Sequence, residues 1–357
     1  MTYIAKKQLY RLIFAGLLVV LAVLMILFST VGSASISFGE SARILISHIP
    51  FIRNFINAEN INKTYESIII NIRMPRIILS VIAGTGLSVV GAAFQGIFRN
   101  PMADPYMLGT SSGAALGASV GIVLQSSILA DVSTNTLSIG ITSIGAFAGA
   151  IITTIVVYGI ARVVNRVPTT TLILAGVAVN FLTSSGVSFI MMFKPNHMEK
   201  IMFWTMGSFS AGGWKQILVL FPVVLIGTVF ISMYARDLNI IATGTETAKT
   251  LGVDADRVKK ILLAVSSALI AVIVSFTGII GFAGLVVPHI IRLILGPDHR
   301  VVIPFSALAG AIFMLICDTV ARTVISPSEI PVGLITSLLG APFFIYLLIS
   351  SKKKVKI

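Results

Sequence analysis

Long apolar tracts without charged residues alternate with short polar segments along almost the whole chain. A helix of about 20 apolar residues spans the hydrocarbon core of a bilayer and satisfies its own backbone hydrogen bonds there. The pattern therefore predicts an all-α polytopic membrane protein whose residues 1–357 form a single transmembrane domain. Nine tracts have this character: residues 12–31, 77–98, 106–129, 137–161, 169–193, 216–235, 261–287, 301–317 and 330–351.

Basic residues at both ends of the chain require an even number of spans. Lys6, Lys7 and Arg11 precede the first tract, and a lysine-rich segment at 352–356 follows the last one. The positive-inside rule therefore places both termini in the cytoplasm. Nine spans would place them on opposite sides of the membrane, so one more helix is needed.

The tenth helix is expected where glycines interrupt the seventh tract. Gly278, Gly281 and Gly284 are expected to break the helix before Pro288, a residue that suits the first turn of a new helix. Residues 289–296 would then form a short half-span. We therefore expect ten transmembrane helices.

Small residues recur at four-residue spacing in two neighbouring tracts. Gly113, Gly117 and Gly121 lie in one tract, and Gly145 and Gly149 lie in the next. This spacing lets two helix backbones approach closely. These helices are expected to pack closely against other protein segments, although generic helix packing explains any single pair equally well.

The composition restricts the possible functions. Hydrophobic residues make up 56% of the chain and charged residues 11%, which excludes a water-soluble enzyme. Most of the formal net charge of +13 falls on the side expected to be cytoplasmic, so the basic character marks orientation and implies no nucleic acid partner. One cysteine, Cys317, and four scattered histidines predict no disulfide framework and no metal site, and we expect no catalytic residue.

The predicted spans carry no ionisable residue near their middle. Ion-coupled carriers usually keep such a residue at the membrane midplane, so a secondary carrier is disfavoured. A membrane-embedded enzyme acting on lipid or isoprenoid is the other alternative, and it would need polar clusters at the same depth. The sequence has no G-x-x-x-x-G-K-S/T phosphate loop, so ATP and Mg would be bound by a partner subunit and this chain is expected to hold no cofactor.

Uncharged polar residues in the tract 169–193 are the candidate lining of a translocation path. Asn180, Thr183 and Ser184 are three or four residues apart, so they share a helical face at mid-depth. Hydrogen bonds between helices, or hydroxyl groups bonded back to their own helix, explain the same residues equally well. The inner end of the tract adds Thr169, Thr170 and Thr171.

Three groups of motifs resemble those of a known family. The first runs from RMPR at 73–76 to RNPMADP at 99–105, the second covers GIIGFAGLVVPHIIR at 278–292, and the third comprises Asp318, Arg322 and EIPVG at 329–333. In this order and spacing they resemble the permease subunit of type II ABC importers, the FecCD-like family for iron-siderophores, haem and cobalamin. The resemblance extends from Arg73 almost to the C-terminus.

The resemblance implies a type II ABC importer permease fold with ten transmembrane helices in the bacterial cytoplasmic membrane, surrounded by membrane lipid. It also implies a second permease subunit, identical or paralogous, a dimer of ATP-binding subunits on the cytoplasmic face and a substrate-binding protein outside. ATP binding and hydrolysis would switch the access of a metal-chelate substrate between the two sides. We expect a ferric siderophore because that branch of the family is broad, and haem or cobalamin is the alternative.

The family also suggests the residues that meet these partners. Arg73, Arg76 and Arg322, at the outer ends of spans, would receive carboxylates of the binding protein; snorkelling of arginine at helix ends is the alternative explanation. In the cytoplasmic loop at about 237–260, residues 245–251 are expected to form a short helix ending at Gly252, and Asp254 to cap the next helix. The residues that would couple this loop to the ATPase are Glu246, Ala248, Leu251 and Gly252, although an ordinary connecting loop fits the same pattern. In the outer loop at about 32–76, Ser37 and Glu40 have capping-box spacing and predict a surface helix.

Overall fold

The computed structural model describes residues 3–32, 34, 36–48, 62–128, 135–162 and 168–355, and within these ranges the chain is helical without strands. Lys6 and Lys7 precede the apolar part of the first helix, whereas the end of the lysine-rich segment at 356 lies outside the described residues. The helices are α1 (Tyr3–Thr30), α2 (Phe38–Ser47), α3 (Lys63–Ser67), η3 (Ile68–Arg73), α4 (Met74–Ile97), η4 (Pro105–Leu108), α5 (Thr110–Ile128), α6 (Asn135–Ala161), α7 (Thr169–Phe193), η5 (Pro195–His197), α8 (Met198–Thr205), α9 (Trp214–Met233), α10 (Ala235–Ala242), α11 (Thr245–Thr250), α12 (Ala255–Thr277), α13 (Ala283–Leu295), α14 (His299–Thr323) and α15 (Val332–Val355).

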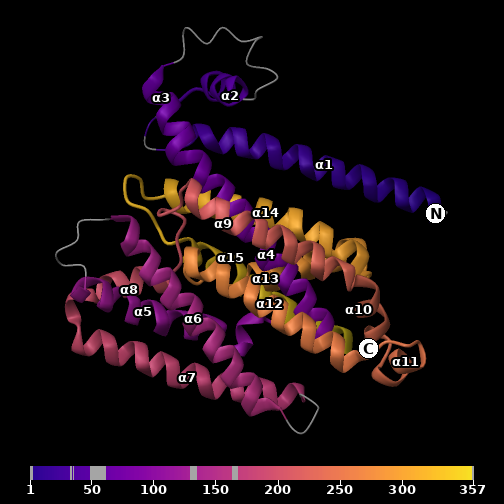
Figure 1. The fold of residues 1–357 in the computed structure, drawn as a ribbon. Coiled ribbons are helices and arrows are strands. Elements are labelled where there is room, and N and C mark those ends of the chain that lie inside the picture. Colours follow the sequence, from indigo (N-terminus) through magenta and orange to yellow (C-terminus); the bar gives the residue numbers. More distant parts are fainter. Residues whose placement is uncertain are drawn as a thin grey trace.

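The number of hydrophobic helices agrees with the sequence prediction. Among the described residues, seven helices are long and apolar enough to cross a membrane, and α13 and the segment Val332–Leu347 of α15 are shorter apolar helices. The uncharged, 19-residue α5 completes the expected ten. The first turn of α1 and the last turn of α15 lie at the same end of the bundle (Figure 1), as an even number of spans requires.

The glycine break predicted in the seventh tract is confirmed, but the predicted start of the next helix at Pro288 was wrong. Helix α12 ends at Thr277, Gly278 adopts a φ of +68°, and α13 begins at Ala283. Pro288 lies inside α13 instead of in its first turn. A proline removes the hydrogen bond to the carbonyl four residues earlier, here that of Gly284. The chain thus breaks at Gly278, ten residues before the proline. Pro288 itself lies within α13, the helix that packs on α4.

Helix α4 is the centre of the bundle. In its most apolar window 83% of the residues are buried, and it contacts α9, α12, α13 and α14. Glycines allow this packing, because a Cβ on Gly84 would overlap the carbonyl oxygen of Gly310 in α14 and a Cβ on Gly91 would overlap that of Gly284 in α13. The predicted close backbone packing is confirmed, and the structure shows that its partners are α5 and α6, since Gly113 approaches the backbone of Gly149 and Gly117 that of Gly145.

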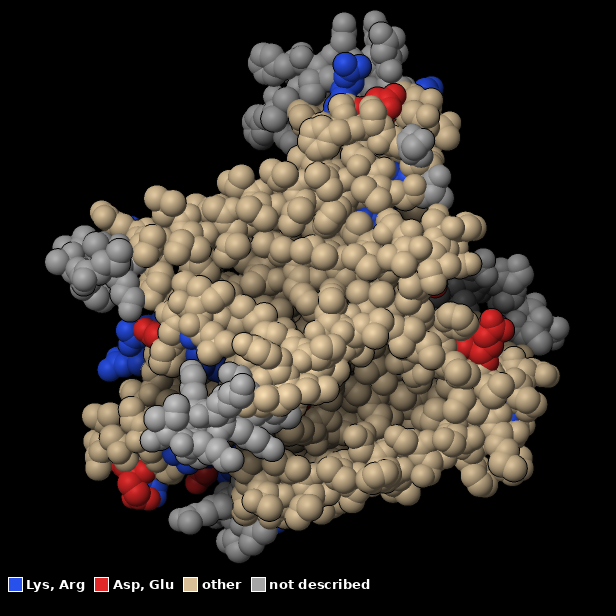
Figure 2. All heavy atoms as spheres, turned by 180° about the vertical axis from the view of Figure 1, so that it is seen from behind, with Lys and Arg blue, Asp and Glu red and all other residues tan. Residues whose placement is uncertain are grey.

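The two ends of the bundle carry different short helices. Helices α2 and α3 lie at one end, called here the α2 end, and α10 and α11 lie at the opposite end, called the α11 end (Figure 1). The predicted surface helix is confirmed as α2, with the Ser37 and Glu40 side chains forming a capping box. On the face seen in Figure 2, charged residues gather toward the periphery, and the broad middle is uncharged. This distribution fits a protein whose middle is surrounded by lipid.

Candidate functional site

Three arginines that the sequence singled out lie together at the α2 end. Arg73 ends η3, Arg76 lies in the first turn of α4 and Arg322 in the last turn of α14. They are 5%, 9% and 9% exposed, respectively. Because a buried charge without partners is strongly unfavourable, these three charges must be balanced inside the protein.

Arg76 is the centre of the arginine cluster, which comprises Arg73, Arg76, Arg322, Asp318 and Glu329. The Nε atom of Arg76 donates to Oδ1 of Asp318 at 2.9 Å, and Nη1 donates to Oε1 of Glu329 at 2.8 Å. Asp318 is fully buried, and its Oδ2 lies 3.9 Å from Nε of Arg322. The Glu329 side chain, by contrast, is 42% exposed. The cluster thus joins a buried ion pair to one that remains open to solvent.

The two outer arginines of the cluster hold the end of α1. Nη1 of Arg73 donates to the carbonyl oxygens of Ser29 at 2.6 Å and Thr30 at 2.9 Å. Nη1 of Arg322 donates to the carbonyl oxygen of Val31 at 2.9 Å. The last carbonyls of a helix lack partners within that helix and favour a nearby cation. These arginines therefore fasten α1 to α4 and α14.

The burial of these three arginines restricts how a partner protein could bind them. Snorkelling would place the guanidinium groups in water, whereas all three are buried. An incoming carboxylate would have to take over donors that now serve Asp318, Glu329 or the α1 carbonyls. Exchange at Arg76 needs the least rearrangement, because Glu329 is half exposed. Docking of a partner on these arginines stays a prediction.

The predicted helix, glycine and helix arrangement between α10 and α12 is confirmed. Helix α11 ends in a Schellman motif, with Gly252 N donating to Lys249 O at 3.0 Å and Val253 N to Ala248 O at 2.9 Å. Gly252 adopts a φ of +79°, which a residue with a Cβ rarely takes. Asp254 then caps α12, because its side chain accepts a hydrogen bond from Arg257 N at 3.0 Å.

The four predicted coupling residues differ in exposure. Glu246, Leu251 and Gly252 lie at the surface, and Leu251 is 61% exposed. Ala248 is fully buried, so it can act only by supporting the segment. An exposed leucine at the tip of a short rigid helix suits contact with another protein. The coupling role itself stays a prediction.

A polar link that was not predicted from the sequence joins α10 to α14. Asn239 Nδ2 donates to Oδ1 of Asp298 at 2.6 Å, and Oδ1 of Asn239 accepts from the backbone N of His299 at 2.8 Å. Oδ1 also lies 2.8 Å from Nδ1 of His299, and since an amide oxygen only accepts, Nδ1 carries the proton. The link ties the segment before α11 to the first turn of α14. Asp298 also caps α14, because its side chain accepts a hydrogen bond from Arg300 N at 2.9 Å, but no local sequence pattern indicates a partner 59 residues away.

A second polar link joins α4 to α13 near the same end. Gln95 Nε2 donates to the carbonyl oxygen of Leu285 at 3.0 Å, and Gln95 Oε1 accepts from Nη1 of Arg292 at 2.7 Å. Gln95 is 3% exposed, so these bonds satisfy a buried amide. Together they fix the position of α13 along α4.

The turn after α4 reaches the break between α12 and α13. Asp104 Oδ1 accepts from Tyr106 N at 2.9 Å, and the Tyr106 hydroxyl donates to the carbonyl oxygen of Ile280 at 2.6 Å. Burial raises the pKa of the Asp104 carboxyl, and the hydrogen bond from Tyr106 N opposes that rise. The turn thus braces the irregular segment that follows Gly278.

The polar series in α7 does not form one face of an internal path. Thr183 is buried, and its hydroxyl donates to the carbonyl oxygen of Val179 at 2.8 Å, which is the back-bonded alternative. Asn180 and Ser184 are exposed on the outside of the chain, as are Thr169 and Thr170, whereas Thr171 is half-buried. A path along this surface would need a second wall that this chain does not supply.

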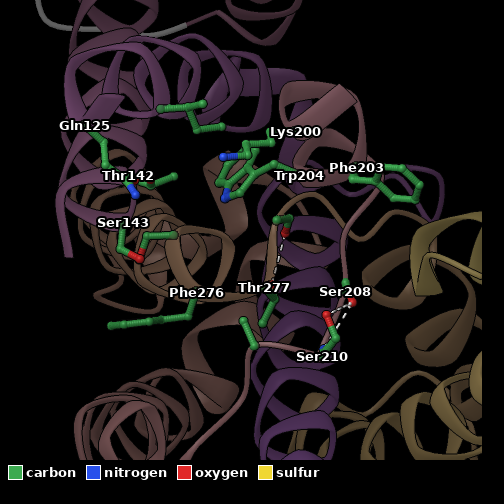
Figure 3. Close-up of a pocket in the computed structure, with 14 residues that line it drawn as sticks. Gln125, Thr142, Ser143, Lys200, Phe203, Trp204, Ser208, Ser210, Phe276 and Thr277 are labelled. Carbon is green, nitrogen blue, oxygen red and sulfur yellow. Dashed lines mark hydrogen bonds between the residues drawn. The ribbon is translucent and has the colours of Figure 1, made fainter. Parts of the chain in front are cut away.

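A cavity of about 370 Å³ with a mostly apolar lining opens near the break after α12 (Figure 3). Gln125, Thr142 and Ser143 line it from α5 and α6, and Lys200 and Trp204 from α8. Ser208 and Ser210 lie on its other side, with Ser208 Oγ donating to Ser210 Oγ at 2.9 Å. Among the described residues, no three His, Cys, Asp or Glu side chains converge as metal ligands.

Comparison with known proteins gives a consistent family assignment. The FecCD transport family matches residues 17–350. The cobalamin import system permease protein BtuC of Halobacterium salinarum is 46% identical over 286 residues, covering 80% of this chain and 74% of that protein. The hemin transport system permease protein HmuU of Yersinia pestis is 36% identical over 345 residues, covering 96% and 97% of the two chains.

A solved structure has the same fold. An inward-facing conformation of a metal-chelate type ABC transporter superposes with a TM-score of 0.79 at 28% sequence identity. The match covers 95% of this chain and 99% of that one, so it includes nearly the whole bundle.

Proposed function

Since the chain belongs to the FecCD transport family, we propose that it is the subunit through which an ATP-driven importer moves a metal chelate inward across the cytoplasmic membrane. The observation that carries the proposal is the match of the entire helical bundle to a metal-chelate type ABC transporter. The chain is a multi-pass permease of the type II ABC importer class. We place the α11 end and both termini in the cytoplasm, as the positive-inside rule predicts.

The partners follow from three surfaces. A dimer of ATP-binding subunits, which would hold ATP and Mg, contacts Leu251 and the adjoining surface of α11. A second permease, identical or paralogous, covers the outer face of α7 and completes the path along Asn180 and Ser184. A substrate-binding protein docks at the α2 end, over the arginine cluster.

An iron chelate is the substrate we propose first, because that branch of the family is broad. An Fe(3+)-citrate import permease, YfmE of Bacillus subtilis, is 34% identical over 333 residues. Cobalamin is the second candidate because the Halobacterium salinarum cobalamin permease is 46% identical. Both substrates are bulky complexes that would cross whole.

Uptake in a strain lacking this gene tests the proposal. Radiolabelled ferric siderophore, haem and cobalamin are supplied separately, with and without the gene restored on a plasmid. Restored uptake of the iron chelate supports the first candidate, and restored uptake of cobalamin alone replaces it with the second. If no chelate depends on the gene, the proposed function is wrong.

The partly exposed ion pair between Arg76 and Glu329 predicts how the binding protein would dock. Substituting Glu329→Gln removes the carboxylate that competes for Nη1 of Arg76, so we expect binding-protein affinity to rise about fivefold, a change of about 1 kcal/mol that is typical of an exposed ion pair. Surface plasmon resonance with the assembled transporter measures this change. Arg76→Glu should weaken docking and lower the ATPase activity that the binding protein stimulates. The matched control is Glu199→Gln, which removes an exposed carboxylate in α8. Unchanged affinity in both cluster variants would contradict docking at Arg76.

Gly252 predicts a coupling defect. Gly252→Trp is expected to reduce transport at least tenfold while the ATPase continues to hydrolyse ATP, because a bulky side chain would stand at the tip of the segment and strain its positive φ. Transport and hydrolysis are measured together in proteoliposomes. Gly244→Ala, which also changes a glycine of positive φ but adds only a methyl group, separates backbone strain from obstruction. Normal transport by a stable Gly252→Trp complex would refute the coupling role.

A further inference from the structure

A groove at the α11 end lies between α1 and the segment that joins α13 to α14. It has a volume of about 670 Å³, within the range of pockets that bind small molecules. Lys7 and Arg11 line it from α1, and Arg300 lines it from the start of α14. None of the mechanistic features described above uses this groove.

The wall of the groove is fixed by aromatic contacts. The Tyr10 hydroxyl donates to the carbonyl oxygen of Leu295 at 3.1 Å. The Phe305 ring meets Tyr10 and Phe14 edge to face, with centroid separations of 6.2 and 5.5 Å. These contacts hold α1 in place against α13 and α14. The adjacent side of α1, which carries Arg11, Ala15 and Leu18, is exposed.

The lining changes from cationic to apolar with depth. Lys7 and Arg11 are one helical turn apart, and Ala15 and Leu18 continue the same stripe of α1 toward the middle of the membrane. At 1.5 Å per residue, Leu18 lies about 10 Å deeper than Arg11. Leu18 is 46% exposed, so an apolar surface lies below the charged mouth.

The mouth of the groove favours an anion. Lys7, Arg11 and Arg300 are all exposed, and the carboxylate that shares the lining is Asp298. Oδ1 of Asp298 already accepts hydrogen bonds from Asn239 Nδ2 and from the backbone N of Arg300. Three cationic side chains thus share the lining with one carboxylate, which leaves the mouth of the groove with a net positive charge.

We propose that this groove binds one anionic glycerophospholipid of the cytoplasmic leaflet. The phosphate headgroup contacts Lys7, Arg11 and Arg300, and an acyl chain lies along Ala15 and Leu18. An anionic head above an apolar chain matches the order of the lining, and basic pockets between membrane helices on the cytoplasmic side recognise such lipids. The bound lipid would join α1 to the loop before α14, which also carries the Asp298 link to α10.

Native mass spectrometry of the purified transporter complex tests the lipid site, with phosphatidylglycerol titrated and phosphatidylcholine as the neutral comparison. Each basic residue near an anionic lipid contributes roughly a factor of five in affinity. The double variant Lys7→Gln/Arg11→Gln should therefore bind phosphatidylglycerol about 25-fold more weakly, and Arg300→Gln about fivefold more weakly. Ala15→Trp keeps every charge but fills the groove, and should also weaken binding at least fivefold.

The matched control is Lys194→Gln/Lys215→Gln, which removes two exposed cations at the other end of the bundle and should change affinity less than twofold. Equal binding of phosphatidylglycerol and phosphatidylcholine by the unaltered protein would overturn the proposal. So would an equal loss in the control, or full affinity in the Ala15→Trp variant. Arg300→Gln is on a different helix from the double variant, so the test survives if α1 fails to insert without its basic residues.

Discussion

Replacing Asp318 by alanine is expected to lower the free energy of unfolding by about 3–5 kcal/mol, the usual effect of removing one partner of a buried ion pair. The carboxylate is fully buried between Arg76 and Arg322. Loss of this carboxylate would leave Arg76 with only the exposed Glu329, and Arg322 with backbone carbonyls alone. Thermal unfolding of the detergent-purified protein, with the folded fraction measured by size-exclusion chromatography, gives the change in stability.

Two further variants separate the ion pair from general sensitivity to mutation. Glu199→Ala removes an exposed carboxylate in α8 and should change stability by less than about 0.5 kcal/mol. The double substitution Asp318→Leu/Arg76→Met should recover part of the loss, because apolar residues of similar volume replace the ion pair between Arg76 and Asp318, and only Arg322 is left buried without a carboxylate. Wild-type stability of Asp318→Ala would show that the cluster is not an energetic anchor of α1, α4 and α14.

The arginine cluster also shows where sequence information ends. Arg73, Arg76 and Arg322 were recognisable because cations are unusual at the outer ends of spans. Their burial and their partners were not recognisable, since Arg76 and Asp318 are 242 residues apart. Residue type and spacing along one helix carry no information about such contacts. The same limit explains why Asn239 was missed.

Local patterns gave more reliable predictions than long-range ones. The capping box of α2 and the Schellman ending of α11 depend on residues within one turn, and both are confirmed. The glycine break after α12 was predicted correctly, but the start of α13 was placed too late because Pro288 is a strong local signal for a helix start. The packing of α13 on α4 overrides that signal, and only the structure reveals it.

Gly91→Ala is expected to lower the free energy of unfolding by about 3 kcal/mol, at the upper end of what overpacking usually costs. The new methyl group would overlap the carbonyl oxygen of Gly284, and a backbone atom cannot rotate away as a side chain can. Helix α13 would have to shift relative to α4, which also strains the hydrogen bond between Arg292 and Gln95. Thermal unfolding measures stability, and proteoliposome uptake measures the accompanying loss of transport.

Gly159→Ala in α6 is the matched control, because a methyl group there meets no atom within 4 Å. Replacing an exposed helical glycine by alanine should be neutral or should stabilise the protein by up to about 1 kcal/mol. If both glycine variants unfold like the wild type, α13 can move freely along α4 and the contact is not a constraint. If only Gly91→Ala loses stability and transport, the fixed position of α13, set by the Gly91 contact and the Gln95 link, is required for a working permease.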